Sequence, residues 1–157
     1  MALGPNAQLI MNLVPALELV IGRQPPVPDL PPKEAQNRFR MVFRRFLGVF
    51  ARKEHPLALF LDDLQWLDTA TLDLLEHLVT HPEVRHVLLV GAYRDNEVGA
   101  AHPVLRTLEA IRNAGAPIQE IVLAPLRIND VGRLVSDALH CELEHARPVA
   151  ELAGMAP

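Results

Sequence analysis

The stretch Leu57-Ala-Leu-Phe-Leu-Asp-Asp63 decides the fold of this chain. An unbroken apolar run of this length predicts a short strand buried in a sheet. Adjacent carboxylates at the end of a buried strand are costly unless something compensates them. A magnesium ion would do so, with Asp62 holding the ion directly or through water and Asp63 polarising a water toward a phosphate. In the alternative interpretation, Asp62 accepts backbone amides and Asp63 caps a turn.

Beyond this stretch, extended and helical patterns alternate. Helices and strands are expected, in chain order, at 69–80 (helix, capped by Asp68), 86–93 (buried strand), 103–114 (helix), 119–123 (strand) and from about 129 (helix that buries Leu134 and Leu139). A last short helix is expected near Pro148. Strands that alternate with helices predict an α/β fold, with a parallel sheet, right-handed crossovers and flanking helices. In such sheets ligands bind beyond the carboxyl ends of the strands.

Arg94 and Pro125 follow the second and third expected strands. If the first two strands are neighbours, Arg94 points toward the same crevice as the two acids and can contact a terminal phosphate. The alternative is a purely structural ion pair with Asp62, Asp63 or Asp95. Pro125 either forms a wall against a flat base or simply ends its strand.

The first third of the chain reads as helical. The pattern over residues 6–21 is interrupted by Pro15, which lacks an amide donor and should kink or split the helix. Residues 24–32 are rich in proline and read as an extended spacer. The clearest helix spans 34–53 and carries four of the five Phe. Its arginines lie mostly off the apolar stripe, and a solvated face is the preferred interpretation over a phosphate or nucleic-acid site.

Composition bounds the class of protein. The chain has 157 residues, 50% hydrophobic and 22% charged, which suits one globular domain. A net charge of -4 argues against a generally basic nucleic-acid binder. The single Cys excludes a disulfide framework. No run is long enough to cross a membrane and no signal peptide is visible, so a cytoplasmic location is expected. His77 and His81 share helical spacing but are expected at a solvated helix end.

Three motifs carry a resemblance to a known family. The stretches Leu59-Phe-Leu-Asp-Asp-Leu-Gln-Trp-Leu-Asp68, Gly91-Ala-Tyr-Arg-Asp-Asn-Glu97 and Leu123-Ala-Pro-Leu126 resemble STAND-type AAA-like ATPase modules, which belong to signal-transduction ATPases with numerous domains. The likeness is strongest to the modules of large bacterial sensor kinases, and it covers nearly the whole chain. It implies a P-loop NTPase fold with ATP and Mg²⁺ as cofactors of the intact module.

The resemblance also implies a role for each matching residue. Asp62 corresponds to the magnesium-side acid of the Walker B motif, and Asp63 to the acid that activates water. Arg94 matches the sensor arginine near the γ-phosphate. Pro125 matches the proline that lines the nucleotide base.

One motif of the family is absent from these residues. Such modules carry a G-x-x-x-x-G-K-[ST] loop, whose amides and lysine bind the phosphates. The chain has 13 Arg but only two Lys, and neither Lys33 nor Lys53 has Gly before it or Ser or Thr after it. We therefore expect a partial AAA-like ATPase domain over 1–157. Its expected parts are a helical segment 1–55, an α/β core 56–126 and the start of a helical lid at 127–157.

Two functions follow from these patterns. The first is a fragment of an ATP-binding signalling ATPase that does not hydrolyse ATP alone. The second is a non-enzymatic interaction module, which pairs through an exposed sheet edge with a protein partner or with a second copy of itself.

Overall fold

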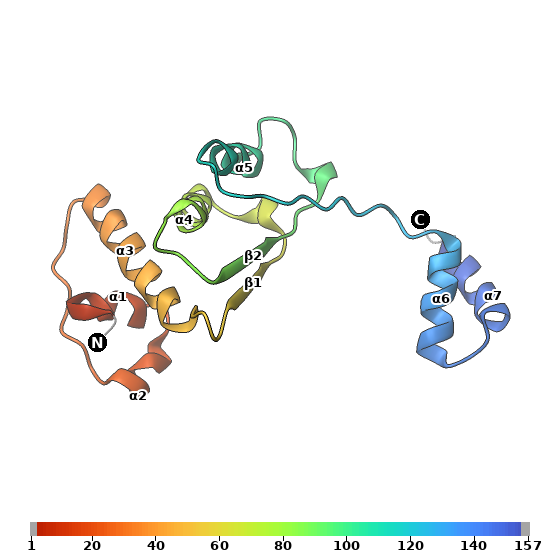
Figure 1. Cartoon of the computed structure of the whole chain (residues 1–157), viewed down its shortest axis with the longest axis horizontal. Helices are drawn as coiled ribbons and strands as arrows, with labels where there is room; N and C mark the ends of the chain where they lie inside the picture. The colour runs from red at the N-terminus through yellow and green to blue at the C-terminus, as the bar shows by residue number, and fades with distance from the viewer. Residues whose placement is uncertain (1–2, 155–157) are drawn as a thin grey trace. The chain divides into compact units, whose positions relative to one another are not determined.

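The computed structural model describes residues 3–154 (Figure 1). The chain divides into two compact units between Ile118 and Gln119. Each unit is described by itself below. Among the described residues, no helix is both long and apolar enough to span a membrane.

The first unit begins with a small helical cluster. Its helices are α1 (Ala7–Met11), α2 (Glu18–Ile21) and α3 (Pro32–Phe50). The expected break at Pro15 is confirmed, since a 3₁₀ turn starts there and separates α1 from α2. The long helix is confirmed too, although it begins two residues earlier and ends three residues earlier than the sequence pattern predicts. Its buried contacts with α1 form the first hydrophobic cluster, made of Leu3, Ala7, Ile10 and Val42.

The sheet of the first unit has two parallel strands, β1 (Leu57–Leu61) and β2 (Val87–Gly91). The helix α4 (Thr69–Thr80) connects them, and α5 (Pro103–Asn113) follows β2. The positions of both strands and both helices confirm the sequence pattern. Asp68 caps α4 as expected, because its carboxylate accepts a hydrogen bond from the Thr71 amide at 2.7 Å.

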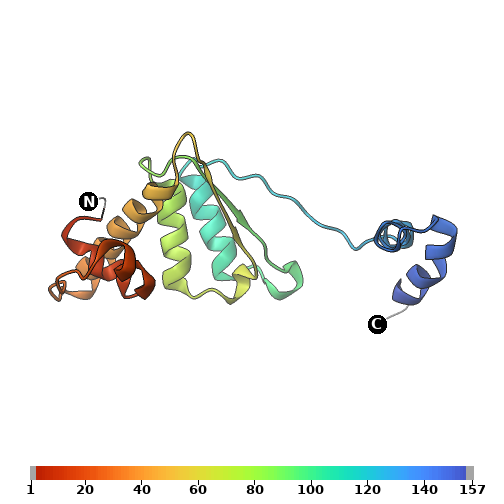
Figure 2. The ribbon, with the colours of Figure 1, turned by 90° about the horizontal axis from the view of Figure 1, so that it is seen from below.

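Only one face of this sheet is covered. Figure 2 shows α4 and α5 side by side on the same side of the strands. The residues on the opposite face are exposed, with Phe60 at 65% and its neighbour Val90 at 42%, and with Ala58 beside Leu88 in the next pair. The prediction of fully buried strands is therefore wrong for this face. Its apolar residues have the composition of a buried sheet, but no described helix of this unit packs on them.

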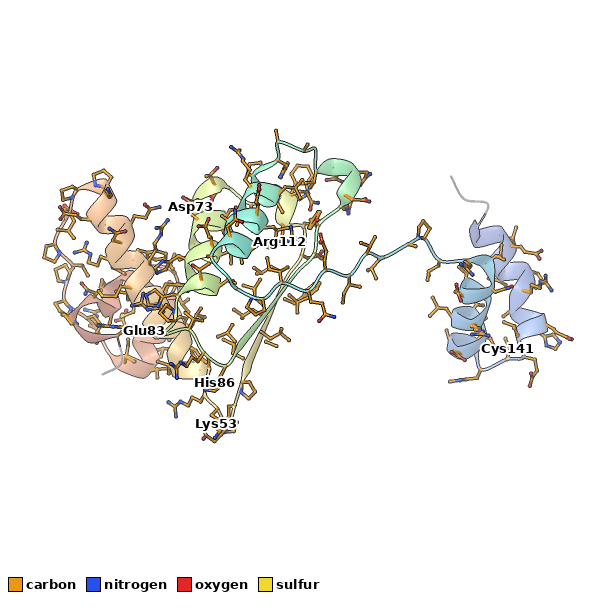
Figure 3. All side chains as sticks on the ribbon, turned by 45° about the horizontal axis from the view of Figure 1, so that its top comes forward. Lys53, Asp73, Glu83, His86, Arg112 and Cys141 are labelled. Carbon is orange, nitrogen blue, oxygen red and sulfur yellow. The ribbon has the colours of Figure 1, made fainter. Side chains whose placement is uncertain are left out.

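The packing of α3 against α4 corrects a second expectation. The Arg40 guanidinium lies 3.7 Å from the Asp73 carboxylate, and the Arg44 guanidinium lies 3.0 Å from that of Glu83. Both acids are labelled in Figure 3. Arg44 also contacts a ring nitrogen of His77 at 3.4 Å. These arginines are thus mostly buried between helices, and His77 is half-buried, because α4 lies over the face of α3 that was predicted to be solvated.

The second unit is helical. It contains α6 (Ile128–Leu139) and α7 (Leu143–Gly154), which pack against each other. The helix expected near Pro148 begins earlier, and that proline lies inside α7. The prediction that Leu134 and Leu139 are buried is wrong, since they are 60% and 63% exposed. A pair of helices has room to bury only the facing stripe of each.

The third predicted strand is also absent from the structure. Residues 119–123 have no strand assignment, and Ile121, Val122 and Leu123 are 76–87% exposed. The apolar, β-branched composition that predicted a strand is present. A strand also requires a neighbour for its backbone amides and carbonyls, and none pairs with this segment in the described part of the chain.

Candidate functional site

The turn after β1 starts the candidate site. Asp63 has a left-handed backbone (φ 53°, ψ 46°), which is uncommon for a residue with a side chain. Its amide donates to the Asp62 carboxylate at 2.9 Å. A short 3₁₀ turn, Leu64–Trp66, follows and returns the chain toward α4. The reversal therefore places the two carboxylates at the carboxyl end of the strand, as the sequence pattern predicts.

The end of β2 is tied to this turn by the backbone. The Ala92 amide donates to the Leu61 carbonyl at 2.8 Å, and the Leu64 amide donates to the Ala92 carbonyl at 2.9 Å. Gly91 makes this approach possible, because a Cβ there would meet the Leu64 side chain at 2.5 Å. The two strand ends thus form one continuous surface.

Gln65 lies at the centre of that surface. It is the buried polar residue of the described chain, only 9% exposed. Its side-chain nitrogen donates to the Asp63 carboxylate at 3.0 Å and to the Glu97 carboxylate at 3.3 Å. Its side-chain oxygen accepts from the Arg94 amide at 3.4 Å. A single side chain therefore contacts both turns.

Arg94 faces the same group of acids. Its Nε lies 3.7 Å from the Asp63 carboxylate, and its Nη1 lies 3.2 Å from the Glu97 carboxylate. The Arg94 side chain is 65% exposed. Water screens ion pairs at such a position, so these contacts hold the guanidinium weakly. The arginine can therefore exchange an acid partner for another anion at small cost.

The structure brings together three of the four residues singled out from the sequence. Asp62, Asp63 and Arg94 lie at one edge of the sheet, with Arg94 in contact with Asp63. Two contacts match the structural alternatives: Asp62 accepts a backbone amide, and Arg94 pairs with Asp63. Pro125 belongs to the second unit, Gln119–Pro157. The functional roles of all four residues remain predictions.

Gln65 and Glu97 both lie in stretches that carry the family resemblance, but the sequence assigned neither a specific role. A signal for Gln65 was present, since a polar residue stands between Leu64 and Trp66 in an otherwise apolar stretch. Glu97 stands three residues after Arg94, which is the spacing of an ion pair within one helical turn. Neither signal shows that the Gln65 side-chain amide contacts both turns, because Gln65 and the Arg94 turn are far apart in the sequence.

Comparison with protein families identifies the family to which the chain belongs. A family model described as "AAA ATPase domain" matches residues 4–90, which is more than half of the chain. The chain belongs to the AAA ATPase domain family. The matched segment of the chain includes β1, Asp62, Asp63 and Gln65. Arg94, Glu97 and Pro125 lie beyond it.

The chain also resembles part of a curated protein. It is 43% identical over 77 residues to Hybrid signal transduction histidine kinase G of Dictyostelium discoideum. The match covers 49% of this chain but only 2% of that relative. No solved structure matches the chain.

The donor set of this AAA ATPase domain suits a hard cation such as Mg²⁺. Carboxylate oxygens are its preferred protein ligands, and it commonly binds through one or two of them with water and substrate phosphates. Asp62 is exposed and adjacent to Asp63, so both carboxylates are accessible. Among the described residues, no group of three His, Cys, Asp or Glu comes together as a complete protein ligand set. The residues therefore fit a magnesium ion that takes its other ligands from water and phosphate.

The lysines of the AAA ATPase domain do not take part in this arrangement. Lys53 precedes β1, whereas the two carboxylates follow it. Figure 3 shows Lys53 beside His86 at the opposite end of the strands from the site. Lys33 lies in the first turn of α3. The described residues thus provide acids and an arginine at the carboxyl end of the sheet, but no lysine there.

Proposed function

We propose that this chain is part of a STAND-type signalling ATPase module, of the kind found in large sensor kinases and regulators, with a partial P-loop fold. The contact between Asp63 and Arg94 carries the proposal. It brings the acid that we propose to activate water and the arginine that we propose to sense phosphate to the carboxyl ends of neighbouring parallel strands. Ligands of α/β sheets bind at that edge.

The roles of the residues follow from their chemistry. Bound Mg²⁺ would neutralise the charge of the phosphates. Asp62, exposed and next to the backbone amide of Asp63, would hold the ion through a carboxylate oxygen. Asp63 would accept a proton from water, and Arg94 would leave its acid partners for the terminal phosphate. Pro125 would line the base in the intact module.

We further propose that the chain does not hydrolyse ATP by itself. Most of the affinity for phosphates in P-loop enzymes comes from the amides and lysine of the phosphate loop, and no such motif occurs in the sequence. Titration calorimetry with Mg-ATP should show no tight binding. A submicromolar dissociation constant would overturn this part of the proposal.

A weaker, local interaction tests the site itself. We expect millimolar Mg-ATP to shift the amide resonances of Asp63 and Arg94 in ¹⁵N spectra of the chain. The double variant Asp62→Asn/Asp63→Asn should lose these shifts, and Asp29→Asn, which changes an exposed acid of the proline-rich loop, should keep them. If Mg-ATP shifts no resonance in either strand-end turn, the proposed site is wrong.

A second candidate function rests on the uncovered sheet face. Phe60, Leu88 and Val90 are 42–65% exposed on one side of two strands whose outer edges are unpaired in the described chain. Parallel sheets usually have both faces covered, and an open edge is a template for another strand. In this alternative the chain is an interaction module, which pairs with a protein partner or with its own copy.

Light scattering during size-exclusion chromatography tests the second candidate for pairing between copies of the chain. An interaction module that pairs with itself should elute as a dimer or larger species at high concentration, and Phe60→Lys should convert it to a monomer. A clean monomer at all concentrations argues against self-pairing. Neither result depends on nucleotide, so the ATPase proposal is tested independently.

A further inference from the structure

The structure assigns Gln65 as the positioning residue of the candidate site: its buried amide keeps Asp63 and the Arg94 turn in register across the two strand ends. The functional meaning of this assignment rests on the proposed nucleotide site. Its structural content does not, because every contact that it invokes lies within the chain itself.

The number and direction of the Gln65 contacts support the assignment. A glutamine amide offers two N–H donors and one carbonyl oxygen. Here the nitrogen donates to Asp63 at 3.0 Å and to Glu97 at 3.3 Å, and the oxygen accepts from the Arg94 amide at 3.4 Å. The partners belong to two different turns. Arg94 also contacts acids of both turns, but a guanidinium offers donors only, whereas Gln65 both donates and accepts.

The difference in burial shows whether the Gln65 hydrogen bonds or the Arg94 ion pairs hold the two turns in place. The ion pairs of Arg94 are exposed and therefore screened by water. Gln65 is 9% exposed, and a buried amide that loses its partners pays the full cost of desolvation. The register of the turns thus depends on Gln65 more than on the arginine. Arg94 can leave Asp63 for a phosphate while Asp63 stays in place.

The backbone conformation of Asp63 shows why its carboxylate needs to be held by Gln65. A left-handed backbone is uncommon for a residue other than glycine, although Asp adopts it more readily than most, so contacts that hold Asp63 stabilise this conformation. The Gln65 amide binds the Asp63 carboxylate on one side, and the Asp62 carboxylate binds the Asp63 amide on the other. The orientation of the acid is therefore set before any ligand arrives.

The three hydrogen bonds of the Gln65 amide make the assignment testable by substitution. Gln65→Glu keeps an oxygen acceptor for the Arg94 amide but places a third carboxylate against Asp63 and Glu97. Gln65→Leu keeps most of the volume and removes all three hydrogen bonds. The matched control is Gln36→Glu, the same chemical change at an exposed position of α3.

Amide hydrogen exchange and ¹⁵N spectra of the chain, without metal or nucleotide, provide the measurement. We expect Gln65→Leu to speed exchange of the Arg94 amide at least tenfold and to shift the Asp63 resonance. Gln65→Glu should shift Asp63 and Glu97 but keep most of the Arg94 protection. Gln36→Glu should change none of the three. The assignment is overturned if Gln65→Leu leaves Arg94 protection and the Asp63 resonance as they are.

Two further results keep the test decisive. If Gln65→Leu does not fold, the wild-type chain provides the test. The side-chain amide protons of Gln65 should exchange slowly with solvent. Their resonances should not move in 0.5 M NaCl, which weakens exposed ion pairs. Fast exchange there overturns the assignment. Failure of the nucleotide proposal appears differently, as absent Mg-ATP shifts in a chain that retains this Gln65 pattern.

Discussion

The first unit contains two hydrophobic clusters that differ in what they support. The first cluster, Leu3, Ala7, Ile10 and Val42, joins α1 to α3 at a distance along the chain from any candidate site residue. The second cluster, Leu64, Leu72 and Val104, joins the turn after β1 to α4 and α5. Leu64 stands between Asp63 and Gln65 in the sequence. The second cluster therefore supports both the fold and the geometry of the site, whereas the first supports the fold alone.

Truncation of one residue in each cluster should show this difference most strongly. Leu72 is 2% exposed and Ile10 is fully buried. We expect Leu72→Ala and Ile10→Ala each to lower the free energy of unfolding by about 2–5 kcal/mol. Urea denaturation measures that loss. In ¹⁵N spectra, only Leu72→Ala should shift the amides of Gln65 and Arg94, and equal shifts in both variants would refute the distinction.

Adding a methyl group at a glycine should change the unfolding free energy less than the truncations do, and differently near the second cluster than in α3. Gly91→Ala places a Cβ 2.5 Å from the Leu64 side chain in the second cluster, so Leu64 must move. We expect a loss of about 1–3 kcal/mol in unfolding free energy. Gly48→Ala in α3 is the control, since its Cβ meets nothing within 4 Å.

The control should behave in the opposite direction. Alanine favours a helix over glycine by about 1 kcal/mol at an exposed interior position, so Gly48→Ala should stabilise the chain slightly. Thermal unfolding of both variants gives the comparison. A Gly91→Ala variant as stable as the wild type would show that the strand-end turn is loosely packed.

The clusters also explain how far the sequence predicts the fold. Local patterns predicted β1, β2, α4, α5 and the Asp68 cap, because each depends on residues close in the chain. They were wrong about a strand at 119–123, since a strand needs a partner that a local pattern does not contain. They were wrong about the uncovered sheet face for the same reason.

The site was predictable to a similar extent. Apolar strands followed by Asp62-Asp63 and by Arg94 placed these residues at one sheet edge, and the parallel pairing of β1 with β2 agrees. The amide of Gln65, which bridges residues 29 and 32 positions away, was not predictable. Its contacts join two turns that are far apart in the sequence, and a local pattern does not show which turns meet.

The packing of α3 against α4 should make the stability of the folded chain fall at lower pH. Burial lowers the pKa of His77 from its ordinary value of 6.5, and His81, Arg40 and Arg44 lower it further through their charges. The unfolded chain therefore binds a proton at a higher pH than the folded chain. Stability should fall as the pH decreases from about 6.5 toward the lower folded pKa.

Unfolding midpoints measured between pH 7.5 and pH 5 test this dependence. His77→Gln should flatten the slope in that range, because the replacement does not titrate. His55→Gln, at an exposed histidine before β1, should leave the slope unchanged. An unaltered slope in His77→Gln would mean that the contact between α3 and α4 does not restrict protonation.

The smallest effect is expected at the start of the helix that carries Leu72. The pKa of Asp68 lies below its ordinary value of 3.8, mainly because the Thr71 backbone amide donates a hydrogen bond to the carboxylate. The carboxylate form is thus favoured in the folded chain. Its contribution to stability is fully present above 3.8 and is lost as the pH falls through the folded pKa.

Two substitutions separate the charge of this cap from its hydrogen bond. Asp68→Asn keeps an oxygen for the Thr71 amide, so it should retain most of the stability near neutral pH while losing the acid-dependent part. Asp68→Ala loses both. Circular dichroism during acid titration from pH 5 to pH 2.5 measures the difference. Because α4 connects the cap to Leu72, fraying of its first turn should also broaden the Gln65 amide in Asp68→Ala, and an unchanged Gln65 line would show that the second cluster holds the site without help from the cap.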